Sequence, residues 1–396
     1  MRNRILLVVE ATNGGVARHV IDLGMGLADR GHRVHLIYSP LRADPEMLAP
    51  ILSDERIVTA EVPIRRNPGL RDVGALLAIR RFISEHGPFD IVHGHSTKGA
   101  LGCIAALGRP VGRIYTAHGM RSIDPRLKPF PRFVIGCIER LLMRLAHLAI
   151  PVSAFEEAHA VRIGVARSRL KTVTNGIGPA PEVNRDEVRA RLGLTDDQIS
   201  VGYAGRLSPE KGPDRIIDAF HDAAGGNPQA RLVMIGYGPL ETELKQQAEA
   251  LGLGDQVIWL KEGNGRGLMP AFDIYALPSA YEGMPYVLLE ALSAGLPIVA
   301  TDVGGARTVV EDGENGYVVA NWDRAAFAGR IAELLADETL RRRMAASSRG
   351  RAGNFSLARM VDETLAVYAA AGNIVNRGRP VSVSGASLPK GSATRD

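Results

Sequence analysis

The chain of 396 residues is 45% apolar and 23% charged, which is enough apolar material for the cores of two or three domains and excludes a short peptide or a wholly disordered chain. Its net charge of +5 is unevenly distributed: residues 1–185 hold 26 Lys and Arg against 16 Asp and Glu, whereas residues 186–372 hold 18 against 26. The basic first half predicts an anionic partner for that half.

Several features predict a cytoplasmic protein. The two cysteines, Cys103 and Cys137, form neither a CxxC pair nor a disulfide framework, which indicates a reducing compartment and excludes a zinc ribbon. The apolar run from Ile5 to Val9 ends at Glu10, too soon for the apolar core of a signal peptide. Because no stretch holds 18 consecutive apolar residues, we expect no transmembrane span.

Strand-like runs alternate with helical patterns along most of the chain. The first series of predicted strands covers residues 5–9, 34–38, 91–93, 114–116 and 149–152, and the second covers 200–204, 232–235, 257–260, 274–277 and 298–300. This alternation predicts an α/β fold of two Rossmann-like domains, each with a doubly wound parallel sheet. The Gly- and Pro-rich residues 176–181 separate the two series, and we place a hinge there.

The predicted organisation is an N-terminal domain over residues 1–180 and a C-terminal domain over residues 181–372, whose last helix is a candidate to cross back to the first domain. Residues 373–396 are rich in Gly, Ser, Pro, Val and Arg without periodicity, which predicts a disordered tail. No short-period repeat is visible, and this argues against a solenoid.

Gly14 and Gly15 follow the first predicted strand and open a helical pattern that ends at Gly31. Backbone N–H groups at such a helix start lie beside the carboxyl edge of the sheet, where an anion can bind. A tight strand-to-helix turn without a ligand is the alternative interpretation. No GxGxxG motif is present here, which argues against a dinucleotide-dependent redox enzyme.

A basic and apolar stretch runs from Arg121 to His147. It holds six Lys and Arg against two acidic residues, and the apolar residues of its later part recur at helical spacing. A helix on an anionic membrane surface has this pattern. A helix that packs on the domain and exposes a solvated basic face is the alternative. Because the chain shows no recognition module for nucleic acid, we expect no such partner.

Two cations lie five residues apart after the strand predicted at 200–204. Arg206 and Lys211 belong to the turn-rich loop 205–213, whose Pro213 suits the first position of a helix. At the carboxyl end of a strand, the guanidinium can bind a phosphate through two N–H groups while the lysine adds a mobile charge. The loop therefore favours a phosphate site over a merely solvated loop.

Two glutamates lie near the start of the helix that follows the strand predicted at 274–277, one before the helix and one inside it. Pro285 marks the first turn of this helix and Gly295 its C-terminal cap, so Glu282 lies just before the helix beside free N–H groups of Gly283 and Met284. Glu290 lies about a turn and a half inside, on a largely apolar helix, where a buried carboxylate needs a partner such as hydroxyl groups. The alternatives are a helix-start carboxylate stabilised by the helix dipole and an exposed helical glutamate.

The order of these motifs resembles the family-four retaining glycosyltransferases of the GT-B fold. The resemblance covers nearly all of residues 1–372, and its most specific part is 278–305, with two glutamates eight positions apart and an Ala-x-x-Ala-Gly-x-Pro continuation. At two places the chain departs from the family pattern: Asn175-Gly176-Ile177 is followed by Gly178 rather than Asp, and Met284 stands where Phe or Leu is common.

The resemblance implies roles for individual residues. A nucleotide-sugar donor would lie in the cleft between the domains, near the start of the first helix at Gly14 and Gly15. The diphosphate would be held by Arg206 and Lys211, the ribose by Glu290, and the transferred sugar by Glu282 and by the backbone of Gly283 and Met284. His118, in Thr116-Ala117-His118-Gly119, would contact the sugar from the other side and orient it for catalysis together with Glu282.

The resemblance thus implies a retaining, metal-independent hexosyltransferase without a cofactor, in which cations and helix ends stabilise the leaving diphosphate. We expect a saccharide acceptor, linked to a lipid diphosphate, in the biosynthesis of exopolysaccharide, capsule or lipopolysaccharide, and a peripheral position on the inner face of the cytoplasmic membrane. A soluble acceptor is the alternative to the lipid-linked one. The alternatives are a nucleotide-sugar epimerase or hydrolase on the same scaffold and a non-catalytic sugar-nucleotide-binding protein.

Overall fold

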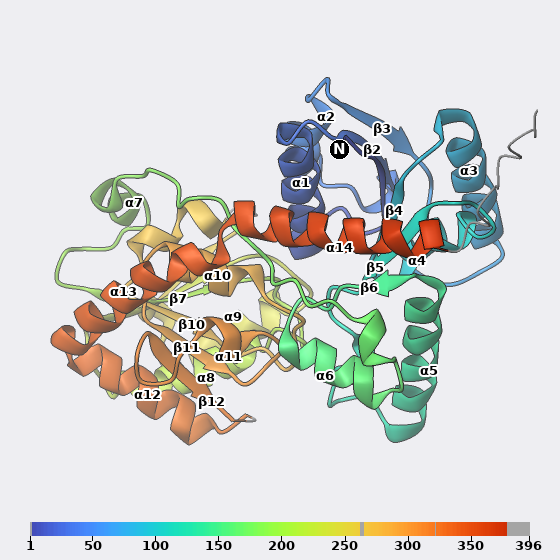
Figure 1. Ribbon diagram of the computed structural model, residues 1–396. Helices are drawn as coiled ribbons and strands as arrows, with labels where there is room; N and C mark the ends of the chain where they lie inside the picture. Colours follow the sequence, from blue (N-terminus) through green and yellow to red (C-terminus); the bar gives the residue numbers. More distant parts are fainter. Residues whose placement is uncertain (1, 262–264, 321, 378–396) are drawn as a thin grey trace, which may run out of the picture.

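A computed structural model describes residues 2–261, 265–320 and 322–377 of the chain. Figure 1 shows two α/β bodies side by side, each built around one sheet, and we call them the N-terminal and the C-terminal domain. Each sheet has six strands, and every strand pairing within it is parallel. The predicted α/β fold with two doubly wound parallel sheets is therefore confirmed.

The sheet of the N-terminal domain has the strand order β3-β2-β1-β4-β5-β6. Its strands are β1 (Arg4–Val9), β2 (Arg33–Tyr38), β3 (Ile57–Glu61), β4 (Ile91–His95), β5 (Gly112–Thr116) and β6 (Leu148–Ala149). The helices between and after them are α1 (Gly14–Asp29), α2 (Pro45–Leu52), α3 (Arg71–His86), α4 (Ser96–Ala105), α5 (Pro129–Leu145) and α6 (Ala154–Arg162).

The sheet of the C-terminal domain has the equivalent order β12-β11-β10-β7-β8-β9. Its strands are β7 (Ile199–Ala204), β8 (Ala230–Ile235), β9 (Val257–Leu260), β10 (Ile274–Leu277), β11 (Ile298–Thr301) and β12 (Gly316–Val319). Its helices are α7 (Arg185–Arg191), α8 (Pro213–Ala224), α9 (Glu241–Ala250), α10 (Tyr286–Ser293), α11 (Ala306–Val309), α12 (Arg324–Ala336) and α13 (Glu338–Ala352), and α14 (Leu357–Arg377) follows them.

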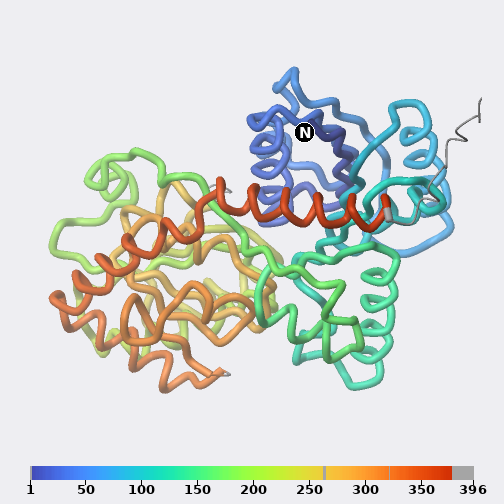
Figure 2. Tube along the Cα trace, viewed as in Figure 1, coloured from blue at the N-terminus to red at the C-terminus, as the bar shows by residue number. Residues whose placement is uncertain are grey.

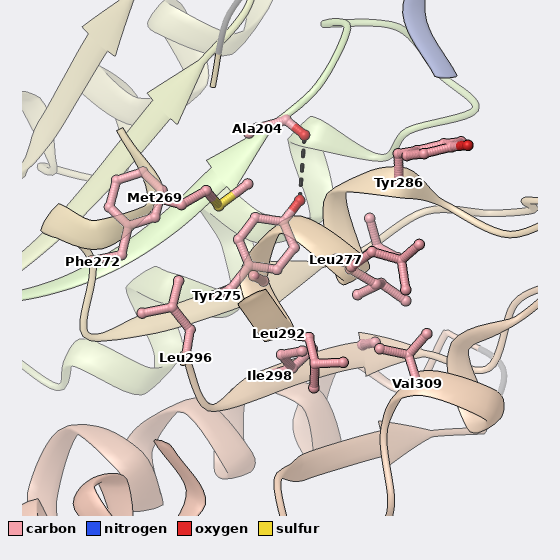
Figure 3. Packing of buried hydrophobic residues seen from close by; sticks show 14 of the residues in the cluster. Ala204, Met269, Phe272, Tyr275, Leu277, Tyr286, Leu292, Leu296, Ile298 and Val309 are labelled. Carbon is pink, nitrogen blue, oxygen red and sulfur yellow. Dashed lines mark hydrogen bonds between the residues drawn. The ribbon is translucent and has the colours of Figure 1, made fainter. Parts of the chain in front are cut away.

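Central strands bury side chains on both faces, as parallel sheets covered by helices require. Alternate residues of β10 belong to different cores: Tyr275 and Leu277 to one, Ile274 and Ala276 to the other. Figure 3 shows the first of these cores, in which the Tyr275 hydroxyl donates a hydrogen bond to Ala204 O at 3.3 Å. This bond joins a side chain of β10 to the last residue of β7, and these two strands carry loops of the candidate site.

The structure adds two strands to those that the sequence predicts and shortens a third. β3 is partly exposed and lacks the continuous apolar run of a central strand, whereas β12 is buried and apolar, so the sequence holds a signal for β12 that the prediction missed. The strand predicted at 149–152 ends at Ala149 as β6, two residues before Pro151, which lacks the N–H that a continued strand would need.

The chain crosses between the domains twice, and the two crossings lie side by side. Ile177 N donates to Phe355 O at 2.8 Å, and Leu357 N donates to Ile177 O at 3.0 Å. Beyond the second crossing, α14 runs back over the N-terminal domain, as the red end of the trace in Figure 2 shows. There Asp362 pairs with Arg30 at 2.7 Å, so the last helix packs on the domain that begins the chain.

The beginning of the predicted tail is wrong by five residues. The sequence predicts disorder from residue 373, but α14 continues to Arg377, and beyond the predicted boundary Asn373 and Ile374 still border the N-terminal domain beside Leu148. Residues 378–396, the rest of the predicted tail, lie outside the described residues. No helix in the described part of the chain is long and apolar enough to cross a membrane.

Candidate functional site

The predicted site residues come from loops at the carboxyl ends of central strands in both sheets. The strand order reverses between β1 and β4 in one sheet and between β7 and β10 in the other, and ligands of open α/β sheets bind at such points. Gly14 and Gly15 follow β1, and His118 follows β5. Arg206 and Lys211 follow β7, and Glu282 follows β10. The structure therefore brings the predicted residues to facing edges of the two sheets.

The two domains meet through backbone at this place. A Cβ atom added to Gly283 would lie 2.7 Å from Gly119 N, so only glycine fits there. Ser153 Oγ donates to Gly283 O at 3.2 Å, and Asn175 Nδ2 donates to Met284 O at 2.9 Å. The loop that carries His118 is thus fixed against the loop that carries Glu282.

Lys211 and Glu282 form an ion pair at the centre of the C-terminal side. Lys211 Nζ lies 2.6 Å from Glu282 Oε1, and Ser279 Oγ donates to the same oxygen at 2.9 Å. Arg206 is exposed beside them, and its carbonyl accepts a hydrogen bond from the Tyr203 hydroxyl at 2.9 Å. Lys211 and Glu282, which the resemblance assigns to diphosphate and sugar, are therefore held together before either meets a ligand.

Two helix starts face each other across the domain boundary. α1 begins at Gly14, whose φ of +61° favours glycine, and a Cβ on Gly15 would lie 3.3 Å from Cδ2 of Tyr286, the first residue of α10. α8 begins at Pro213, as predicted, after Gly212 with φ +61°. The N-termini of helices carry partial positive charge, so the loops converge on a place suited to an anion.

Glu290 lies on α10 among positive charges. Burial raises the pKa of its carboxyl group, and the charges of Arg18 on α1 and Arg266 oppose that rise. None of the described residues hydrogen-bonds its side chain, and the expectation that hydroxyl groups satisfy this carboxylate stays a prediction. Glu290 is therefore placed to accept hydrogen bonds from a ligand between the domains.

Three histidines converge on the N-terminal side of the site. His95 Nδ1 lies 3.0 Å from His118 Nε2, and the ring of His19 lies 4.5 Å from that of His118. Burial and the neighbouring histidines lower the pKa of His118 well below its usual value, so its imidazole is neutral at pH 7. His118 adopts φ +58°, a conformation rare outside glycine and Asn, which marks a residue held in place by its surroundings.

This cluster is also the place where a metal ion could bind. Nitrogen atoms of the three rings lie within 4.8 Å of one another, and in the described part of the chain no other group of three or more His, Cys, Asp or Glu side chains does this. Neutral imidazole is a good ligand for zinc. The expectation that the reaction needs no metal stays a prediction.

Sequence reasoning missed four side chains of the site: His19, His95, Asn175 and Tyr286. His19 Nδ1 lies 3.1 Å from Asn175 Oδ1 and 3.3 Å from the Tyr286 hydroxyl, so these residues join α1, the connecting segment and α10. The sequence holds a signal for His95, because His93 and His95 are two residues apart at the end of a predicted strand. It holds no such signal for His19, Asn175 and Tyr286, because these three residues are far apart in the sequence and meet only in the fold.

We predict that acid destabilises the protein through His19. Burial lowers the pKa of His19 from 6.5 to about 4 in the folded chain. Below pH 6.5 the unfolded chain therefore binds more protons than the folded chain, so the stability due to this group is complete above pH 6.5 and falls as the pH drops towards 4. At pH 5 the loss is roughly 2 kcal/mol.

Urea unfolding of the wild type and of His19→Gln at pH 7 and pH 5 measures this effect. The variant should lose less stability between the two pH values than the wild type, by roughly 2 kcal/mol. His221→Gln, at an exposed histidine of α8, is the matched control and should keep the wild-type difference. An unchanged pH dependence in His19→Gln would show that this imidazole is not held neutral by burial.

Two family models and a curated relative match most of this chain. Residues 184–351 match the family model described as Glycosyl transferases group 1, and residues 13–180 match that described as Glycosyltransferase Family 4. The chain is 30% identical over 389 residues to the D-inositol 3-phosphate glycosyltransferase of Stackebrandtia nassauensis, and the match covers 90% of this chain and 86% of that one.

Solved structures share the fold. The crystal structure of HepE from Anabaena in complex with UDP and glucose superposes with a TM-score of 0.79 at 22% identity, over 93% of this chain and 100% of that chain. WaaG, a glycosyltransferase involved in lipopolysaccharide biosynthesis, superposes with a TM-score of 0.73 at 19% identity, over 92% and 99%. With a relative of 30% identity along most of both chains and family models on both domains, this chain belongs to the group 1, family 4 glycosyltransferases of the GT-B fold.

Proposed function

We propose that this glycosyltransferase moves a hexose from a nucleotide-sugar donor to a saccharide acceptor, with retention of the anomeric configuration and without a metal ion. The observation that carries the proposal is the meeting of the Lys211–Glu282 pair with the His118 loop at facing helix starts. Cations and helix N-termini suit the diphosphate, and carboxylates suit sugar hydroxyls. UDP-glucose is the first donor to test, because the structural relative HepE is described with UDP and glucose.

Donor binding would exchange one ion pair for another. Lys211 leaves Glu282 for the diphosphate, where Arg206 adds a second cation, and Glu282 is then free to accept hydrogen bonds from the sugar. Glu290 accepts from the ribose hydroxyls, which replace the water that solvates it. The neutral His118 orients the sugar from the N-terminal side. Gly283 and Met284 offer backbone N–H groups at the start of α10, and Gly14 and Gly15 offer those at the start of α1.

In the proposed reaction the bond between the anomeric carbon and the diphosphate oxygen breaks, and its electron pair goes to the diphosphate. The acceptor hydroxyl attacks the same face of the sugar and passes its proton to the departing phosphate oxygen. Lys211, Arg206 and the helix starts stabilise the charge on the leaving group, which is the role that a metal ion would otherwise fill. No covalent bond to the protein is needed.

We place the acceptor among lipid-diphosphate-linked saccharides of polysaccharide biosynthesis, and the enzyme at the inner face of the cytoplasmic membrane. The basic N-terminal half suits an anionic acceptor and an anionic lipid surface. Two relatives support separate parts of this proposal: one is named for D-inositol 3-phosphate, which is an anionic compound, and WaaG is described in lipopolysaccharide biosynthesis.

Helix α5 is the proposed membrane contact. The apolar residues that the sequence places at helical spacing are exposed on it: Phe130 to 76%, Phe133 to 69% and Leu141 to 56%. A helix that only packed on the domain would bury its apolar side chains. Exposed aromatic residues beside Lys and Arg are typical of a helix that lies in the membrane interface.

We predict that Lys211→Ala and Glu290→Gln each weaken binding of the nucleotide-sugar by roughly 1–3 kcal/mol, the range for a lost hydrogen bond to a charged group. A thermal-shift screen of UDP-, GDP- and ADP-sugars identifies the donor, and calorimetry measures its affinity. Lys245→Ala, at an exposed lysine paired with Glu241 on α9, is the control and should bind like the wild type. Unchanged affinity in both folded variants would remove these residues from the site.

We also predict that the combined substitutions Phe130→Ser, Leu141→Ser and Lys128→Ser reduce sedimentation with phosphatidylglycerol vesicles, because they remove apolar insertion and a surface cation worth about 1 kcal/mol. Donor affinity should stay unchanged. Leu70→Ser, at a leucine that is 91% exposed before α3, is the matched control. Wild-type binding that ignores lipid charge and salt concentration would contradict the membrane contact.

A further inference from the structure

A cavity lies between α5 and α6, and none of the proposed donor residues lines it. Its volume is about 580 Å³, within the range of pockets that hold small ligands. Apolar side chains of both helices and of the preceding loop line it, among them Ile123, Phe133, Phe155 and Ile163. We call this cavity the α5–α6 pocket.

Three arginines border the α5–α6 pocket: Arg132, Arg140 and Arg162. None of them forms an ion pair with a described residue, and the buried Nε atoms of Arg132 and Arg140 have no hydrogen-bond partner among those residues. Arg132 donates only to the backbone oxygens of Asp124 and Leu127. Unpaired guanidinium groups beside an apolar cavity suit a phosphate, which can accept two N–H bonds from each.

The polar groups at the floor of the pocket already have partners inside the protein. Ser122 Oγ hydrogen-bonds the Glu139 carboxylate and lies 2.6 Å from His159 Nε2. Glu139 also accepts from the backbone N–H of Arg121, and it forms no ion pair with the three arginines. The pocket therefore offers apolar contact inside and positive charge at its border, which is the complement of a lipid with an anionic head.

The pocket is continuous with the loop that carries His118. Ser122 and Ile123 follow His118 by four and five residues. Glu156 of α6 accepts hydrogen bonds from Gly119 N and Val152 N, each at 2.8 Å, and so ties the other wall of the pocket to the glycine that meets Gly283. A ligand in the pocket would therefore lie on the acceptor side of the donor site.

We propose that the α5–α6 pocket holds the carrier end of the acceptor: a long apolar chain lies between α5 and α6, and its phosphate binds Arg132, Arg140 and Arg162. This inference rests on the proposed lipid-linked acceptor and names the place where the lipid is recognised. It goes beyond attachment of α5 to a bilayer, since a bilayer would need exposed side chains such as Phe130 and Leu141, which do not line the pocket.

Protection of Cys137 from a thiol reagent can measure whether a ligand occupies the pocket. It is exposed and lines the pocket, whereas Cys103, the other cysteine, is fully buried. The rate at which a thiol reagent labels Cys137 in the full chain should fall at least fivefold with saturating farnesyl diphosphate, a short soluble lipid diphosphate. Farnesol and inorganic diphosphate, each alone at the same concentration, should protect less than twofold. The proposal would be overturned if dihexanoyl phosphatidylglycerol protected Cys137 as strongly as farnesyl diphosphate does, or if farnesyl diphosphate gave no protection.

Variants separate the pocket from its surroundings. Arg140→Gln with Arg162→Gln should abolish protection, and Gly136→Leu should do so by filling the cavity, because a Cβ on Gly136 points at Ile163 and Ser122 at 3.5 and 3.7 Å. Arg144→Gln, on α5 outside the pocket lining, is the matched control and should keep protection. Circular dichroism checks the fold, and protection retained in the folded arginine variant would overturn the proposal.

Transfer assays with the wild type distinguish this inference from the function on which it rests. Transfer to a lipid-diphosphate-linked saccharide that the arginine variant performs as well as the wild type would overturn the pocket alone. Transfer to soluble saccharides only would overturn the lipid-linked acceptor, and the pocket assignment with it. Transfer to the lipid-linked acceptor that falls at least tenfold in the arginine variant, with donor affinity unchanged, would support both.

Discussion

The backbone contact between Gly119 and Gly283 is the constraint on which the candidate site depends. It sets two sheets, formed by separate parts of the chain, at a spacing that no side chain at position 283 would permit. Asn175 and Ser153 hold the same contact by hydrogen bonds to the 283–284 backbone, and α14 returns across the boundary to pack on the N-terminal domain. His118 and Glu282 are the immediate neighbours of these two glycines, so their separation follows from the contact.

The Lys211–Glu282 pair is arranged so that each member has a partner with or without substrate, whereas none of the described residues hydrogen-bonds the Glu290 side chain. Lys211 and Glu282 neutralise each other in the structure, and the proposed donor supplies a diphosphate for one and hydroxyl groups for the other. Burial raises the pKa of the Glu290 carboxyl, while Arg18 and Arg266 oppose the rise, so a hydrogen-bonding ligand would further favour the charged form. The neutral histidines add hydrogen-bonding atoms without adding charge.

Local sequence signals predicted most strands of the two sheets and the loops that carry the candidate site, but not the contacts between those loops. Apolar runs identified the central strands, and Pro213, Pro285 and Gly295 marked helix ends, because these are properties of neighbouring residues. The pairing of Lys211 with Glu282, 71 residues apart, depends on β7 and β10 being neighbours in one sheet. The meeting of His19 with Tyr286, 267 residues apart, depends on how the two domains close on each other. No local pattern records that closure, and the same holds for α14, whose partner helix lies at the other end of the chain.

The stereochemistry of the product tests the central proposal most directly. The protein would be mixed with an α-linked nucleotide-sugar that it is known to bind and with a lipid-diphosphate-linked saccharide, in buffer with excess EDTA. NMR would follow the anomeric proton of the product from the first turnover. The proposal predicts that an α-linked product forms at an undiminished rate, since Lys211, Arg206 and the helix starts stabilise the leaving diphosphate. A β-linked product, or transfer that stops with EDTA and returns with Mg²⁺ or Mn²⁺, would contradict it.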